Sequence, residues 1–100
     1  MPRSIATVTT ENASRYLRQL CKHWSHRFAV EYDPEDLRQG FIDFGDGRRK
    51  VWLTAEGTLL TLTASDEQAE GLPELEVIVA KHIQRFAFKE ELEFVWKPES

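Results

Sequence analysis

Two stretches of the chain repeat their apolar residues with the period of an amphipathic helix. In residues 11–26 and 72–86, apolar side chains recur every three or four positions, which is the spacing of one face of an α-helix. The apolar positions are Ala13, Tyr16, Leu17, Leu20, Cys21 and Trp24 in the first stretch and Leu72, Leu75, Ile78, Val79, His82, Ile83 and Phe86 in the second. We expect Thr10 to cap the first helix and Pro73 to occupy the first position of the second.

Six further stretches have the alternation or the β-branched residues that are typical of strands. They are residues 3–9, 28–32, 41–44, 51–54, 58–64 and 92–96. Gly45-Asp46-Gly47 and Glu56-Gly57 lie between strand patterns, and glycine adopts the positive φ that tight turns need. These turns predict a three-stranded meander over residues 40–64.

The resulting order, β-α-β-β-β-β-α-β, predicts an α+β fold. We expect a two-layer sandwich in which an antiparallel-rich sheet carries both helices on one face. One hundred residues, of which 41% are hydrophobic, suit a single domain over residues 1–100. Strand alternation places Trp52 and Val95 on the face that the helices leave open. An open face with large apolar groups favours a homodimer, because one patch then serves both copies.

Composition narrows the location and the partners of the protein. No apolar run reaches the roughly 18 residues that cross a bilayer, and the N-terminus lacks the apolar stretch of a secretory signal, so we expect no membrane contact. The single cysteine, Cys21, forms no internal disulfide, which suits the reducing cytoplasm. A net charge of −4 repels phosphate backbones, so nucleic acid is not the expected partner.

Three segments carry a family resemblance. Residues 21–28 read Cys-Lys-His-Trp-Ser-His-Arg-Phe, residues 42–47 read Ile-Asp-Phe-Gly-Asp-Gly, and residues 82–90 read His-Ile-Gln-Arg-Phe-Ala-Phe-Lys-Glu. With these segments the chain resembles, over nearly its whole length, a bacterial family catalogued as domain of unknown function 2218. The resemblance implies a stand-alone cytoplasmic α+β protein with no agreed catalytic residues and a link to siderophore-interacting flavin reductases. Gly71 and Pro73 depart from the continuous second helix that it also implies.

Histidine is a preferred ligand of zinc and related metals. On a helix, His23 and His26 point only about 60° apart, and His82 can approach from the second helix, so these three residues form a candidate metal site. Cys21 points about 200° from His23 and does not belong to it. The alternative is that His82 is a structural histidine on the apolar face of the second helix, while His23 and His26 lie at the border of the exposed face of the first helix.

Two other features of the first helix could carry function. Arg15, Arg18 and Lys22 share one face of the helix and could receive an anionic ligand or an acidic partner, although such a face is also typical of a solvated surface. Cys21 sits on the apolar stripe, so we expect a buried hydrophobic residue rather than a catalytic thiolate. Residues 38–44 have only a faint likeness to the aromatic strand of an RNA-binding sheet. In that arrangement the Asp43 carboxylate would lie among the RNA phosphates, so we interpret the likeness as a coincidence.

No catalytic motif and no cofactor motif occurs in the sequence. The leading interpretation is a non-enzymatic binding or accessory domain, which the resemblance links to siderophore and iron metabolism. The alternative is a metal- or small-ligand-binding accessory of an enzyme that uses His23, His26 and His82.

Overall fold

A single antiparallel sheet forms one layer and two helices form the other. The computed structural model describes residues 2–33, 35–44 and 48–99. Its elements are β1 (Arg3–Thr9), α1 (Ala13–Trp24), β2 (Ala29–Tyr32), β3 (Gln39–Asp43), β4 (Arg49–Glu56), β5 (Leu59–Asp66), a 3₁₀ turn (Ala69–Gly71), α2 (Leu72–Phe86) and β6 (Trp96–Glu99). The strands are ordered β2-β3-β4-β5-β1-β6, and every neighbouring pair is antiparallel. The α+β class and the predicted element order are confirmed.

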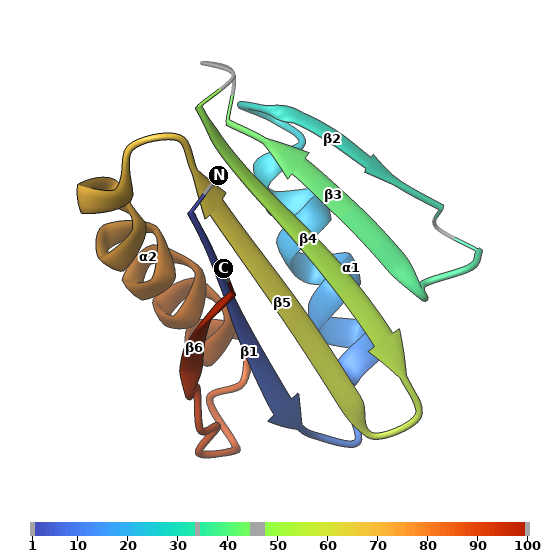
Figure 1. Cartoon of the computed structure of the whole chain (residues 1–100). Helices are drawn as coiled ribbons and strands as arrows, with labels where there is room; N and C mark the ends of the chain where they lie inside the picture. The colour runs from blue at the N-terminus through green and yellow to red at the C-terminus, as the bar shows by residue number, and fades with distance from the viewer. Residues whose placement is uncertain (1, 34, 45–47, 100) are drawn as a thin grey trace.

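The register assigns every second residue of each strand to the face that the helices cover. Leu53 of β4 lies opposite Leu62 of β5, and Ala6 of β1 pairs with the same Leu62, so inward-facing side chains form continuous rows across the sheet. α1 packs on β2, β3 and β4, whereas α2 packs on β5 and β1. Figure 1 looks onto the opposite face, with α1 behind the strands. That face has no helix over it, as the alternation predicts.

Glycine sets the geometry at two positions in this fold. Gly57 has φ = 57° and closes the β4–β5 turn, which confirms the turn predicted at this place. A Cβ at Gly40 of β3 would lie 2.7 Å from Cys21 Sγ and 3.3 Å from Leu17 Cδ2 of α1. The absence of a side chain at residue 40 therefore allows α1 to lie directly on β3.

Three sequence expectations differ from the structure at element ends. Thr10 is not the N-cap residue of α1, which begins at Ala13 after Asn12; its hydroxyl oxygen accepts a hydrogen bond from the backbone N–H of Asn12 while the hydroxyl donates to Glu90. The last strand begins at Trp96, whereas we expected it over residues 92–96. The side chain of Gln84 binds the backbone N–H of Leu92, so this segment is held by a side chain rather than by strand pairing. α2 begins at Leu72, directly after the 3₁₀ turn, and has Pro73 in its first turn.

The predicted Gly45-Asp46-Gly47 turn lies outside the described residues. Asp66 accepts a hydrogen bond from the backbone N–H of Gln68 at 2.8 Å and so caps the turn before α2. Within the described ranges, no helix is long and apolar enough to span a membrane.

Candidate functional site

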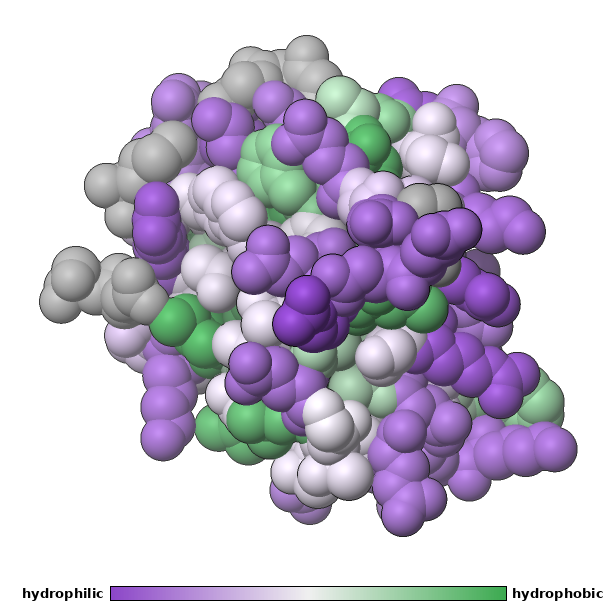
Figure 2. All heavy atoms as spheres, turned by 90° about the vertical axis from the view of Figure 1, so that its right-hand side faces the viewer, coloured by the Kyte–Doolittle hydropathy of each residue, from purple (hydrophilic) through white to green (hydrophobic). Residues whose placement is uncertain are grey.

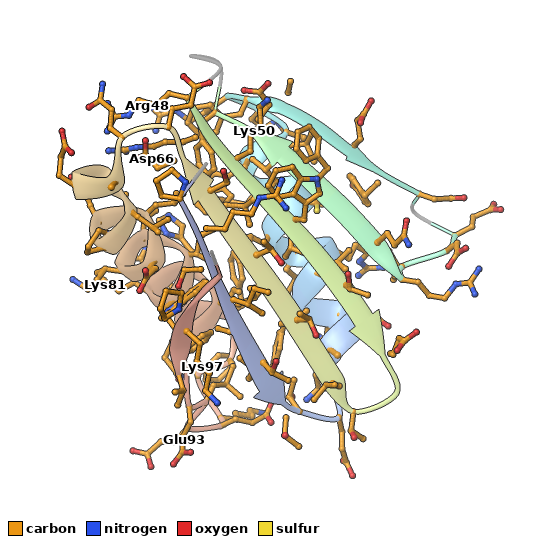
Figure 3. All side chains as sticks on the ribbon, in the orientation of Figure 1. Arg48, Lys50, Asp66, Lys81, Glu93 and Lys97 are labelled. Carbon is orange, nitrogen blue, oxygen red and sulfur yellow. The ribbon has the colours of Figure 1, made fainter. Side chains whose placement is uncertain are left out.

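The open face of the sheet is organised in rows that cross all six strands. The central row runs through Glu31, Phe41, Trp52, Thr63, Ile5 and Lys97, in the order of strands β2 to β6. Its two aromatic residues stand on β3 and β4, whereas β5 and β1 present shorter β-branched side chains. The row begins with the carboxylate of Glu31 at the β2 edge and ends with the ammonium group of Lys97 on β6. Figure 3 labels Lys97.

The aromatic part of this row is an ordered stack. The ring centroids of Phe41 and Trp52 are 5.3 Å apart with an interplanar angle of 40°. The Arg3 guanidinium lies 5.2 Å from the Trp52 ring centroid, and it reaches that ring from β1 across the intervening strand β5. A cation placed over an indole ring contributes about 0.5–1 kcal/mol at an exposed position. Phe41, Trp52 and Arg3 are all half-buried although no helix covers them.

An acidic groove adjoins the stack on the β2 side. It has a volume of about 710 Å³, and its walls include Phe41, Trp52 and the carboxylates of Glu31, Asp33, Asp36 and Glu56. Arg38 is the one cation among the described lining residues, and its Nε lies 2.7 Å from Asp36 Oδ1. Hydrogen bonds from Arg38 lower the pKa of Asp36 and raise that of Arg38 itself. Figure 2, which views the molecule from the side where β2 lies in Figure 1, shows mostly hydrophilic atoms around small apolar patches.

The opposite side of the face is basic and apolar. Ile5, Thr7, Val95, Lys97 and Pro98 line a shallow depression of about 540 Å³. Val95 is 60% exposed there, which bears out its predicted place outside the core. Figure 3 places Lys97 on β6, and Lys50 at the start of β4. Lys97 gives the β6 side of the face a positive charge, whereas Arg3 and Lys50 place theirs over Trp52 and at the start of β4.

Asp66 forms a buried ion cluster at the end of β5. Its side chain is completely buried, and it accepts hydrogen bonds from Arg48 Nε at 2.8 Å and from Arg49 Nε at 3.2 Å. Figure 3 shows Arg48 beside Asp66. The bond from Arg48 lowers the pKa of Asp66 most, although burial opposes it. A Cβ at Gly71 would collide with Asp66 and Arg48, so a glycine is needed where α2 meets the cluster. The cluster joins the end of β5 to the start of β4.

Glu90 forms a second polar network, between the start of α1 and the end of α2. Its carboxylate accepts hydrogen bonds from the Thr10 hydroxyl at 3.0 Å, from Asn12 Nδ2 at 3.0 Å and from the Tyr16 hydroxyl. These bonds, that from Tyr16 first, lower the pKa of Glu90. The pKa of Tyr16 is raised, chiefly because the phenol is buried and also by its bond to Glu90. All four groups thereby hold the loop after α2 against α1.

The structure brings two of the three candidate histidines together. The rings of His23 and His82 are 5.5 Å apart, and the His82 ring also lies 4.9 Å from that of Trp24. His82 Nδ1 is 2.8 Å from the carbonyl oxygen of Ile78, so this nitrogen carries the proton. His26 is exposed beyond the end of α1. Among the described residues no three His, Cys, Asp or Glu side chains are grouped to hold a metal ion, and the three-histidine site stays a prediction.

The other candidates on α1 have the predicted environments. Arg15, Arg18 and Lys22 are exposed on the helix surface, and their role as an anion or partner site stays a prediction. Cys21 is completely buried, and burial raises its pKa to about 11. At that pKa the thiolate is scarce at neutral pH, so Cys21 packs as a small apolar side chain.

Sequence reasoning missed most of the open-face site and both polar networks. It placed Trp52 and Val95 outside the core, but it did not pair Phe41 with Trp52 or place Arg3 over the indole. Those contacts join strands β1, β3 and β4, and their pairing depends on the strand order. Glu90 looked like one of several acidic residues near the C-terminus, because its three donors lie about 80 positions away in the sequence.

Comparison with known proteins agrees with this fold. The family model described as "Uncharacterized protein conserved in bacteria (DUF2218)" matches residues 5–97. Among solved structures, the NMR structure of PA4090 from Pseudomonas aeruginosa is similar to this chain with a TM-score of 0.78 and 39% sequence identity, over 97% of this chain and 96% of that one. No protein with a curated function matches the chain.

Proposed function

The chain belongs to DUF2218, a family of uncharacterised bacterial proteins. We propose that it is a non-enzymatic binding domain whose open sheet face binds another protein. The Phe41–Trp52 stack carries this proposal. It lies on a sheet face without helices and between an acidic and a basic side. Aromatic residues inside a polar rim are typical of protein interfaces.

An open sheet face suits a protein partner better than a small ligand. Small-molecule sites are concave and enclose most of the ligand surface. The face here consists of β-branched and aromatic side chains along strands, and such surfaces pack on a second sheet or helix at about 10 Å. The acidic groove is open and polar, so it is better suited to the charged side chains at the rim of a partner.

Three groups with shifted pKa values serve the fold. Asp66 is bound by two arginines, Glu90 by three donors, and Cys21 is buried with a pKa of about 11. A catalytic acid, base or nucleophile needs a pKa suited to its task and access to substrate. None of these three groups lines the acidic groove or the depression beside β6, and each is already engaged within the fold, which favours binding over catalysis.

Site-specific photocrosslinking in cells tests the proposal. Benzoylphenylalanine at Thr54, an exposed position on the open face, should form a discrete adduct on illumination. The same group at Lys81, exposed on α2, is the matched control and should form none, while a third probe at Arg18 tests the basic stripe on α1. Absence of an adduct from Thr54 at native protein levels would contradict a binding role for the open face.

The close approach of His23 and His82 supports a second candidate, a metal- or small-ligand-binding accessory domain. Two histidine rings 5.5 Å apart on neighbouring helices could share a transition-metal ion with exogenous ligands. Calorimetric titration of untagged protein with Zn²⁺ and with Fe²⁺ tests it. Binding that is lost in His23→Ala and in His82→Ala but kept in His26→Ala would support a two-histidine site. A link to siderophore-interacting flavin reductases stays an implication of the family resemblance.

A further inference from the structure

We propose that the partner of the open face is a second copy of this chain, related by a two-fold axis that runs parallel to the strands. The inference rests on the proposed function and names its partner. It follows from two properties that change across the face, charge and side-chain size. One two-fold rotation makes both properties complementary between the two copies.

Charge varies across the face in the direction of strand order. The β2 side carries Glu31, and the groove beside it adds Asp33, Asp36 and, from the end of β4, Glu56; Arg38 is the one cation among its described lining residues. The β6 side carries Lys97, whereas the guanidinium group of Arg3 reaches from β1 across β5 to Trp52 near the centre of the face. A face with opposite charges at its two sides binds a copy of itself favourably only if the strand order of the second copy is reversed, so that the acidic side of one copy meets the basic side of the other.

Side-chain size varies in the same direction. Phe41 and Trp52 stand on β3 and β4, whereas Thr61, Thr63 and Ile5 stand on β5 and β1. Two sheets pack well when large side chains of one face meet small side chains of the other, because a close-packed interface leaves few voids. The large half of one copy should therefore lie on the small half of the other.

Two aligned packings of identical sheets are available, since stacked sheets keep their strands within about 30° of each other. A two-fold axis across the strands would place each strand on its own copy, so that Glu31 faces Glu31 and Trp52 faces Trp52. An axis parallel to the strands, between β4 and β5, places β2 on β6 and β3 on β1. Only the axis parallel to the strands places acidic side chains opposite basic ones and large side chains opposite small ones.

This axis keeps each row of the register in front of the same row of the partner. Glu31 then faces Lys97 of the partner subunit, Phe41 faces the partner's Ile5, and Trp52 faces the partner's Thr63. The acidic groove receives the basic side of the second copy. Each of these contacts occurs twice, because a two-fold interface is symmetric.

The face is large enough for a stable dimer. Six strands spaced by about 4.8 Å span about 24 Å, and strands of up to eight residues run about 25 Å. Full coverage would bury about 600 Å² per copy, or about 1,200 Å² in total, which exceeds the roughly 1,000 Å² expected of a specific interface.

Charge exchange tests the arrangement by sedimentation velocity of the purified full-length chain at low salt. Glu31→Lys and Lys97→Glu should each raise the dimer dissociation constant about tenfold, since each places like charges in contact twice. The double variant E31K/K97E should restore the dissociation constant to within about threefold of the original. Lys81→Glu and Glu91→Lys, which reverse exposed charges outside the face, should leave it unchanged.

Thr54→Arg serves as a second variant, since residue 54 is exposed and faces the partner's Thr61 near the axis. It should abolish the dimer while circular dichroism shows an unchanged fold. A monomer at 100 µM, a dimer that survives T54R, or two single variants that the double variant does not rescue would each overturn the inference. A crosslinked adduct from Thr54 whose mass differs from two chains would also overturn it, but would leave the proposed binding function intact.

Discussion

Asp66 has the least favourable position for a charge among the described residues, because its side chain is completely buried. The bidentate contact with Arg48 and the bond from Arg49 compensate for the lost hydration. The two guanidinium groups keep 30% and 20% of their side-chain surface in solvent. The cluster therefore places the carboxylate inside the protein and the excess positive charge at its surface.

Asp66→Asn should lower the free energy of unfolding by about 3 kcal/mol, the low end for breaking a buried ion pair, because both arginines can still reach water. Urea denaturation at pH 7 measures the loss. Asp36→Asn is the matched control: its pair with Arg38 is exposed, so the substitution should leave stability nearly unchanged. Equal effects of the two substitutions would show that burial of Asp66 contributes nothing to the strength of its pairing.

Glu90 makes stability depend on acid pH. Its folded pKa lies below the ordinary value because Tyr16, Asn12 and Thr10 donate to the carboxylate. The stabilisation is therefore complete above the unfolded pKa of about 4.3 and is lost as the pH falls through the lower folded pKa. Urea midpoints between pH 6 and pH 2.5 should fall less steeply in Glu90→Gln than in the unaltered chain. Parallel curves would contradict the role of the charged carboxylate in joining the two helix ends.

At the scale of elements, the contact of α1 with β3 depends on one missing side chain. Gly40 faces Cys21 and Leu17, which both belong to the apolar stripe of α1. The helix surface that holds Arg15, Arg18 and Lys22 is exposed. One helix thus combines a tightly packed contact surface, where a single methyl group matters, with a polar surface where the sequence has freedom.

Gly40→Ala should destabilise the fold by about 1–3 kcal/mol, because the new methyl group would overlap Cys21 Sγ in a close-packed layer. In the double variant G40A/C21A the sulfur is gone, so its loss of stability should be smaller than the sum of the two single losses. Thermal melts of the four proteins complete the cycle. Additive losses would mean that Leu17, rather than Cys21, sets the distance between α1 and β3.

For the whole molecule, the arrangement of two helices on one side of six strands leaves a sheet face whose charge and side-chain size both change from one edge to the other. A dimer through this face would link folding to association, because binding stabilises the folded chain by mass action. The thermal midpoint should rise by about 2–4 °C for each tenfold increase in protein concentration. T54R should melt at a midpoint independent of concentration, and a concentration-independent midpoint in the unaltered chain would contradict the dimer.

The hydrophobic pattern alone determined the elements and their faces. The 3.6-residue period of residues 11–26 and 72–86 and the alternation around Trp52 depend only on local spacing, so the α+β class, the element order and the buried Cys21 could all be predicted. Strand ends were less accurate where a side chain replaced strand pairing, as Gln84 does at Leu92.

Tertiary structure alone decided which distant residues meet. The insertion of β1 between β5 and β6 brings Arg3 within reach of Trp52, and the packing of α1 beside the loop after α2 brings Glu90 to Tyr16. Such pairs follow from strand order and register, which no local period encodes, because residues far apart in sequence meet only through the packing of complete elements. The charge and size gradients of the open face arise in the same way, since each is a property of six strands laid side by side.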